Sequence, residues 1–237
     1  MKKYFILFVI TLSLCTYGYA DENSDWDSSV AFSMNLTNGN SNTFLGNISY
    51  YAKKRRVTDE IMFGFETNYG EAEIETNVQN SRCYADYKYL FDKRNYVYFN
   101  MDLSQNEISD IDYRFYLGPG MGRYVIRSEK ISLGLEGGVS YIKEKLGGID
   151  DDRLVLRLYE RFEYKPSDTS RIWQYLEYLP SFEEFSNYLL NFELGIETAI
   201  NSHLNLRLVA QDKYNNVPAV GKEKNDLTFL AGVSYKF

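Results

Sequence analysis

The sequence has few of the residues that catalysis and cross-linking need. Its 237 residues include one histidine and two cysteines. Cys15 lies in an amino-terminal segment that we expect to be removed, so the remaining Cys83 cannot form an internal disulfide. His203 stands without a Gly-x-Ser-x-Gly, His-Glu-x-x-His or paired-cysteine spacing. We therefore expect no catalytic residue, no metal site and no cofactor, and predict that the protein is not an enzyme.

Long hydrophobic runs are missing after the first 20 residues, and the mean hydropathy is −0.40. No later stretch approaches the roughly 20 apolar residues of a membrane helix. Residues 1–20 begin with two lysines after the initial Met, continue with a short apolar run and end in Gly-Tyr-Ala. This pattern is typical of a signal peptide cleaved after Ala20, although an anchoring helix is the alternative. Residues 21–28 would then form a periplasmic amino-terminal segment, and residues 29–237 the mature domain.

Positive charge is also in deficit. The chain has 33 acidic and 26 basic residues, a net charge of −7, and removal of both lysines with the signal peptide makes the net charge −9. An acidic exported protein is a poor candidate for binding nucleic acid. Nucleic acid is therefore not an expected partner.

The sequence is rich in alternation with period two, which is the signal of β-strands. About twelve segments show it, and each has roughly the length that a tilted strand needs to cross a bilayer. An even number of strands places both termini on the periplasmic side, with short inner turns and longer outer loops. The segments begin near Ser29, Thr43, Ile61, Arg82, Asn95, Ile111, Ile131, Arg153, Ile172, Tyr188, Leu204 and Leu227.

Periodicity alone does not decide what covers the apolar face of these strands. A soluble β-sandwich buries that face, whereas a membrane barrel turns it to lipid and encloses the polar one. The polar faces here carry charges of both signs, and many of the 22 tyrosines and 15 phenylalanines lie near segment ends. Both features favour an all-β fold: a transmembrane antiparallel up-and-down β-barrel of about 12 strands, surrounded by outer-membrane lipid.

The last segment, "NDLTFLAGVSYKF", places aromatic or aliphatic residues at every second position and ends in Phe. It resembles the carboxy-terminal signal by which outer-membrane barrels are recognised for assembly, with the barrel-assembly machinery as partner. In a closed barrel it would pair with the first strand, so that no edge remains. The residues of this predicted signal are Phe229, Val233, Tyr235 and Phe237.

Charges in the polar phase are predicted to point into the lumen, where each needs a partner to offset its desolvation. Three alternating glycines, Gly118, Gly120 and Gly122, are expected to relieve crowding there. Glu160 falls in the lipid-facing phase, which suggests a local bulge or a position near the interface. The predicted lumen network comprises Glu66, Asp86, Lys88, Asp102, Arg114, Glu136, Arg157, Arg161, Glu163, Glu193, Glu197 and Arg207.

Three longer motifs carry a family resemblance: "DIDYRFYLGPGMGRYVI", "EYLPSFEEFSNYLLNFELGIE" and "DKYNNVPAVGKEKNDLTFLAGVSYKF". From about Thr43 to Phe237 the chain resembles the salt-induced outer membrane proteins, with departures at Arg123 and Leu227. The resemblance implies an outer-membrane barrel and brings no substrate. The leading hypothesis is a structural protein or a narrow, low-flux pore for ions or small solutes, with a possible link to salt stress. The alternatives are a surface barrel whose acidic loops bind an external partner and, third, a lipid-modifying enzyme.

Overall fold

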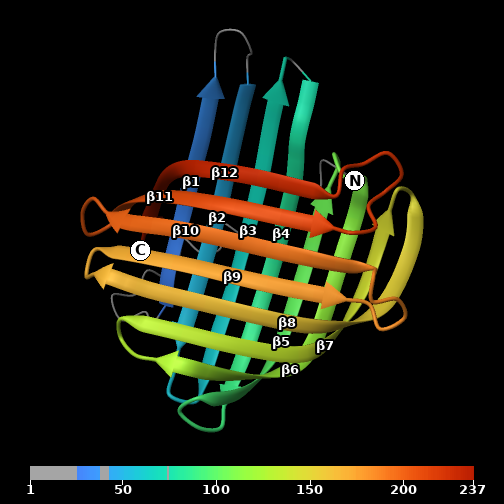
Figure 1. The fold of residues 1–237 in the computed structure, drawn as a ribbon. Helices are drawn as coiled ribbons and strands as arrows, with labels where there is room; N and C mark the ends of the chain where they lie inside the picture. The colour runs from blue at the N-terminus through green and yellow to red at the C-terminus, as the bar shows by residue number, and fades with distance from the viewer. Residues whose placement is uncertain (1–25, 38–42, 74) are drawn as a thin grey trace, which may run out of the picture.

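The computed structural model describes residues 26–37, 43–73 and 75–237. Twelve strands pair antiparallel in chain order, and the last pairs with the first to close a barrel (Figure 1). The predicted signal peptide, residues 1–20, lies outside the described residues. Among those described, no helix is long and apolar enough to cross a membrane. The strands are β1 (Trp26–Thr37), β2 (Thr43–Arg55), β3 (Asp59–Ala72), β4 (Glu75–Leu90), β5 (Asn95–Asn106), β6 (Ile111–Arg127), β7 (Ile131–Leu146), β8 (Ile149–Ser167), β9 (Ser170–Pro180), β10 (Tyr188–Ala199), β11 (Leu204–Asn215) and β12 (Asn225–Lys236).

The apolar phase of the strands faces outward, which confirms the prediction of a membrane barrel. Phe32 and Phe229, in the two strands that close the barrel, are 53% and 63% exposed. In the alternate phase, Glu66 and Glu136 are buried within the wall. Such an arrangement suits lipid outside and a polar interior, and is the reverse of a soluble sandwich.

Two strand boundaries differ markedly from the prediction. β4 begins seven residues before Arg82, and the predicted loop after β7 is a two-residue turn at Gly147 and Gly148. Both glycines have positive φ, 58° and 80°, which a tight hairpin turn needs. Charged residues in these two hairpins hid strands that continue beyond the apolar band. β1 likewise begins earlier than predicted, at Trp26, so the last residues of the predicted segment 21–28 belong to the barrel.

The two ends of the barrel differ in their connections. One end, called here the short-turn end, carries the turns 56–58, 91–94, 128–130, 168–169 and 200–203; the other, the long-loop end, carries loops 107–110, 181–187 and 216–224. The 91–94 turn is fixed by Asp92, which accepts hydrogen bonds from Asn95 and from the backbone N–H of Arg94. These bonds favour the carboxylate and lower the pKa of Asp92 to about 2.

Outward aromatic side chains gather near both ends of the strands. Tyr188 packs against Tyr178 and stacks on Tyr214 near the long-loop end, with ring centroids 5.3 and 5.8 Å apart. Near the short-turn end, Tyr235 packs against Phe237 at 5.3 Å. Aromatic girdles of this kind mark the two lipid–water interfaces of a membrane barrel.

Glu160 lies on the lipid-facing side of β8, as its phase predicts, but not at a bulge. The pairing of β8 with β9 is regular from Leu158 to Tyr164. The carboxylate of Glu160 accepts a hydrogen bond of 2.8 Å from Gln174 Nε2 on β9. A neighbouring side chain therefore offsets part of the cost of placing this acid among apolar residues.

The inner wall is shaped by glycines that receive tyrosine rings. A Cβ atom at Gly120 would lie 2.3 Å from Tyr98 Cζ, and one at Gly122 would lie 2.4 Å from Tyr96 Cζ. Both tyrosines are buried. The alternating glycines of β6 therefore leave space for the tyrosine rings against the inner wall. This is how the glycines relieve crowding in the lumen.

The seam between β1 and β12 is the shortest pairing of the barrel. Its register runs from Ser29 opposite Lys236 to Ser33 opposite Gly232, whereas β1 pairs with β2 from Trp26 to Thr37. Beyond the paired stretch, Asn35 Nδ2 donates to the Phe229 carbonyl oxygen at 2.8 Å. At Gly232 a Cβ would lie 2.0 Å from the Phe32 carbonyl oxygen. Closure therefore requires glycine at this position.

Replacing Gly232 with valine should prevent closure, because the added carbons would occupy the space of the β1 backbone. We expect the folded fraction, measured after refolding in detergent by mobility of unheated and heated samples, to fall several-fold. Ala231→Val is the matched control, since Ala231 is the exposed neighbour on the lipid side. Equal folded fractions for the two variants would contradict this role of the seam.

Candidate functional site in the barrel lumen

The lumen contains two small polar cavities. The larger, about 150 Å³, extends from the short-turn end to mid-height. The smaller, about 80 Å³, lies toward the long-loop end. Both cavities are lined by Arg82, Asp102 and Tyr116. These three side chains therefore lie between the two cavities.

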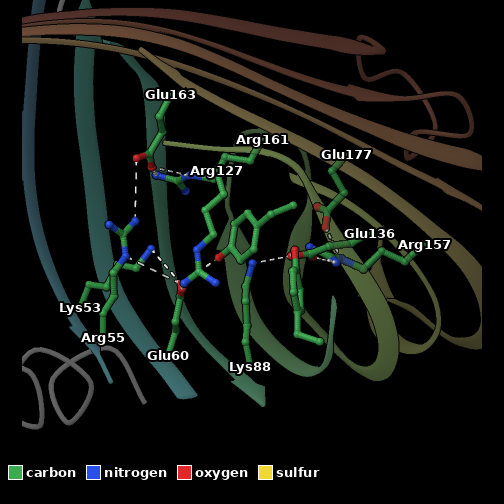
Figure 2. Close-up of polar contacts among 12 residues, drawn as sticks. Lys53, Arg55, Glu60, Lys88, Arg127, Glu136, Arg157, Arg161, Glu163 and Glu177 are labelled. Atoms are coloured by element: carbon green, nitrogen blue, oxygen red, sulfur yellow. Dashed lines mark hydrogen bonds and ion pairs between the residues drawn. The ribbon is translucent and has the colours of Figure 1, made fainter. Parts of the chain in front are cut away.

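Mid-height is occupied by a network of ion pairs centred on Arg157, called here the central network (Figure 2). Arg157 Nη1 lies 2.8 Å from Glu136 Oε2, and its Nε lies 2.7 Å from Glu177 Oε1. Lys88 and Tyr96 also donate to Glu136. Arg157, Glu136 and Glu177 are all buried, and their paired charges offset the cost of burial.

A second group, the mouth network, closes the short-turn end. Glu60 accepts from Tyr124 at 2.9 Å and pairs with Arg127 at 3.2 Å and Lys53 at 3.4 Å. Arg55, on β2, also reaches Glu163 on β8 at 4.0 Å (Figure 2). Because β2 and β8 stand six strands apart in a closed ring of twelve, this pair joins opposite walls. The mouth is therefore narrower than two extended side chains.

Contacts also cross the lumen beside the seam. Glu66 on β3 accepts from Gln211 at 3.1 Å and pairs with Lys213 at 3.4 Å, both on β11. Gln211 donates as well to Glu193 on β10, which in turn accepts from Trp173 Nε1 at 2.7 Å. These bonds connect the two sides of the short β1–β12 pairing.

The long-loop mouth is covered by the 216–224 loop. Lys222 pairs with Asp110 of the β5–β6 loop at 3.3 Å, and Asn216 donates to the Ser186 carbonyl oxygen at 2.6 Å. Asp226, at the start of β12, accepts from Ser109 at 2.8 Å. The loop is thus held to two other loops across the rim.

The structure turns all twelve of the predicted lumen charges to the interior. It brings Lys88, Glu136 and Arg157 together, and it joins Arg161 to Glu163 at 2.8 Å. Four other predicted members form ion pairs with residues outside the predicted set: Glu66 with Lys213, Asp102 with Arg82, Arg114 with Glu144, and Glu197 with Arg171. Glu193 instead accepts hydrogen bonds from Trp173 and Gln211. Asp86 and Arg207 have no ion pair among the described residues.

Several interior charges were missed by the sequence reasoning. The predicted lumen network omits Lys53, Arg55, Glu60 and Glu144, although strand alternation continues through the segments that contain them. Glu177 lies in the segment that begins near Ile172, whose polar face was obscured by inward aromatic side chains. Continuing the period-two pattern through the charged segments predicts that Lys53, Arg55, Glu60 and Glu144 face the lumen. His203 lies exposed in the 200–203 turn, beside Tyr235.

Comparison with solved structures shows which known folds this barrel is similar to. The NanC porin structure shares 8% sequence identity with a TM-score of 0.55, and the match covers 89% of this chain and all of that one. The COG4313 outer membrane channel from Pseudomonas putida F1 shares 11% identity with a TM-score of 0.51, covering 92% of this chain and all of that one. At these identities the likeness is one of fold, that of a transmembrane β-barrel of the outer-membrane type.

The family is identified by sequence. The profile of the family described as "Protein of unknown function, DUF481" matches residues 30–237, and the chain belongs to that family. No curated protein matches the chain.

Removing the central cation should destabilise the barrel strongly. We expect Arg157→Gln to lower the free energy of unfolding by about 3–5 kcal/mol, because it leaves the buried Glu177 without an ion-pair partner and Glu136 with Lys88 alone. Arg56→Gln is the control: Arg56 is 53% exposed and pairs only with Asp59 at 3.4 Å among the described residues, so its loss should cost less than about 1 kcal/mol. Urea unfolding in detergent micelles measures both, and equal losses would contradict a structural role for the network.

Proposed function

We propose that the protein is an outer-membrane barrel that provides a narrow, low-flux pathway for water, ions and small solutes. The observation that carries the proposal is the contact of side chains from opposite walls, Arg55 with Glu163, together with the two small polar cavities. The cavities leave room for water and small solutes, whereas the side chains that meet across the mouth restrict what can pass. Outer-membrane barrels have short turns on the periplasmic side and longer loops outside, so the short-turn end would face the periplasm.

The strand number supports a restricted lumen. Eight strands give an interior that side chains just fill, whereas sixteen to eighteen leave an aqueous channel. Twelve strands lie between these limits, so side chains decide how much of the interior stays open. Here long arginines and tyrosines occupy it, and rotation of the exposed mouth side chains would set the width of the passage.

Planar bilayer recording tests the proposed pathway. The protein should give small, weakly selective conductance steps, and replacing both Arg157 and Arg161 with serine should enlarge them. The cation-to-anion permeability ratio should rise about twofold or more, because the remaining carboxylates then dominate the field in the lumen.

Arg161→Ser alone is a second variant that keeps the central network intact and should shift selectivity in the same direction. Arg56→Ser, in the 56–58 turn, is the matched control and should change neither the conductance nor the cation-to-anion permeability ratio. Wide conductance in the unmodified protein would overturn the narrow pathway. The complete lack of conductance in every variant would favour a structural or surface-binding role.

We propose further that β12 and Phe237 serve as the assembly signal, recognised by the barrel-assembly machinery. The outward face of β12 is an exposed stripe formed by Phe229, Val233, Tyr235 and Phe237. An exposed stripe is accessible to a protein that binds the strand before the barrel is inserted. Phe237 contributes little to the closed wall, with one backbone hydrogen bond of 3.1 Å to the Ser28 carbonyl oxygen.

Phe237→Asp should lower the level of folded protein in the outer membrane several-fold in cells, with unfolded chain accumulating in the periplasm. Refolding of the same variant in detergent should be nearly normal, because the side chain lies on the outer surface. Normal cellular levels would exclude this residue as the signal. Failure in detergent as well would mean that Phe237 acts through stability.

A further inference from the structure

One row of lumen charges, on three consecutive strands, contains two arginines and one acid. Arg171 on β9, Glu197 on β10 and Arg207 on β11 occupy paired positions, so their side chains point to the same face of the wall. Glu197 Oε1 lies 3.5 Å from Arg171, and its Oε2 accepts from Ser234 at 3.0 Å. Arg207 has no ion pair among the described residues, so the row carries one net positive charge.

Both arginines of this row hold donors that the protein does not use. The Nε atoms of Arg171 and Arg207 are buried and lack a hydrogen-bond partner within the described part of the chain. Most buried polar groups in proteins are hydrogen-bonded, and a buried guanidinium donor without an acceptor is costly. The two donors lie on β9 and β11, on either side of β10, and belong to guanidinium groups whose hydrogen-bonding capacity is not fully used within the protein.

An aromatic ring fixes the two guanidinium groups. Their Cζ atoms lie 4.9 and 5.2 Å from the centroid of the Trp173 ring, for Arg171 and Arg207 respectively. The ring is held by its bond to Glu193 and lies against Gly195, where a Cβ would be 2.1 Å from Trp173 Cζ2. The ring thus orients the arginines without neutralising them, since a cation–π contact leaves the N–H groups free to donate.

The row also borders the larger cavity. Arg171, Trp173, Glu197 and Arg207 all line it, and its volume of about 150 Å³ suits a small solute. We propose that these residues form a binding site for a small oxyanion or carboxylate, held by Arg207 with Arg171 beside the Trp173 ring. Guanidinium groups bind such oxygens through charge-assisted hydrogen bonds. This inference names a solute class for the proposed pathway and rests on one part of that proposal, that the lumen admits small solutes from a mouth of the barrel.

Tryptophan fluorescence tests the site directly, because the chain has only two tryptophans. Trp26→Phe leaves Trp173 as the single reporter. Nitrate, a planar oxyanion that quenches indole fluorescence, should quench it saturably, and acetate should compete. Arg207→Gln in the same background should weaken nitrate binding about tenfold, as expected for the loss of a charge-assisted hydrogen bond. Quenching by neutral acrylamide should not change.

Arg123→Gln is the matched control, since Arg123 lies exposed on the outer surface and its loss should leave nitrate quenching unaltered. Linear nitrate quenching that acetate does not relieve, or equal quenching in the Arg207→Gln protein, would overturn the site. The measurement needs no current across a bilayer. Saturable binding without conductance would therefore refute the pathway and keep the site, whereas conductance without saturable binding would refute the site alone.

Discussion

The structure depends on one constraint: within lipid, every backbone N–H and C=O group must find a partner in the chain itself. Twelve antiparallel strands meet this requirement only if β12 returns to β1. The closing register is short, from Ser29 to Ser33, and the approach at Gly232 is close. Closure at that seam fixes which phase of every strand faces lipid. The alternation of the whole chain follows from it.

Closure creates the second problem, an interior that must be filled. Glycines of β6 accept the rings of Tyr96 and Tyr98, and ion pairs occupy the rest. Arg157 shows how one side chain serves two purposes, because the contacts that satisfy Glu136 and Glu177 also obstruct the passage. Stability and permeability are therefore opposed in this lumen. Any rearrangement that widened the centre would have to separate buried charges, at considerable cost.

The fold was predictable from the sequence because period-two alternation assigns each residue to a face. The alternation predicts about twelve strands and an inward face for the charges named, but it does not include the charged strand ends at Lys53, Arg55 and Glu60. Partners were not predictable in the same way. Arg55 meets Glu163 across the lumen, more than 100 residues away along the chain. That meeting depends on strand register and barrel circumference, and alternation contains neither quantity.

The pairing of charges is uneven along the barrel axis, and the unevenness carries functional information. In the central and mouth networks, every cation has at least one carboxylate partner within the protein. In the row of Arg171 and Arg207 two guanidinium donors remain unused, although Glu197 stands between them. A protein selected for stability alone would place a second acid or an apolar residue at the position of Arg207, because a cation in the lumen without an ion-pair partner has less to offset its partial desolvation. Polar groups left unsatisfied beside the larger cavity are where local consistency is given up for binding. The lumen thus combines a matched frame, which holds the wall, with an unmatched cation that an entering anion would neutralise.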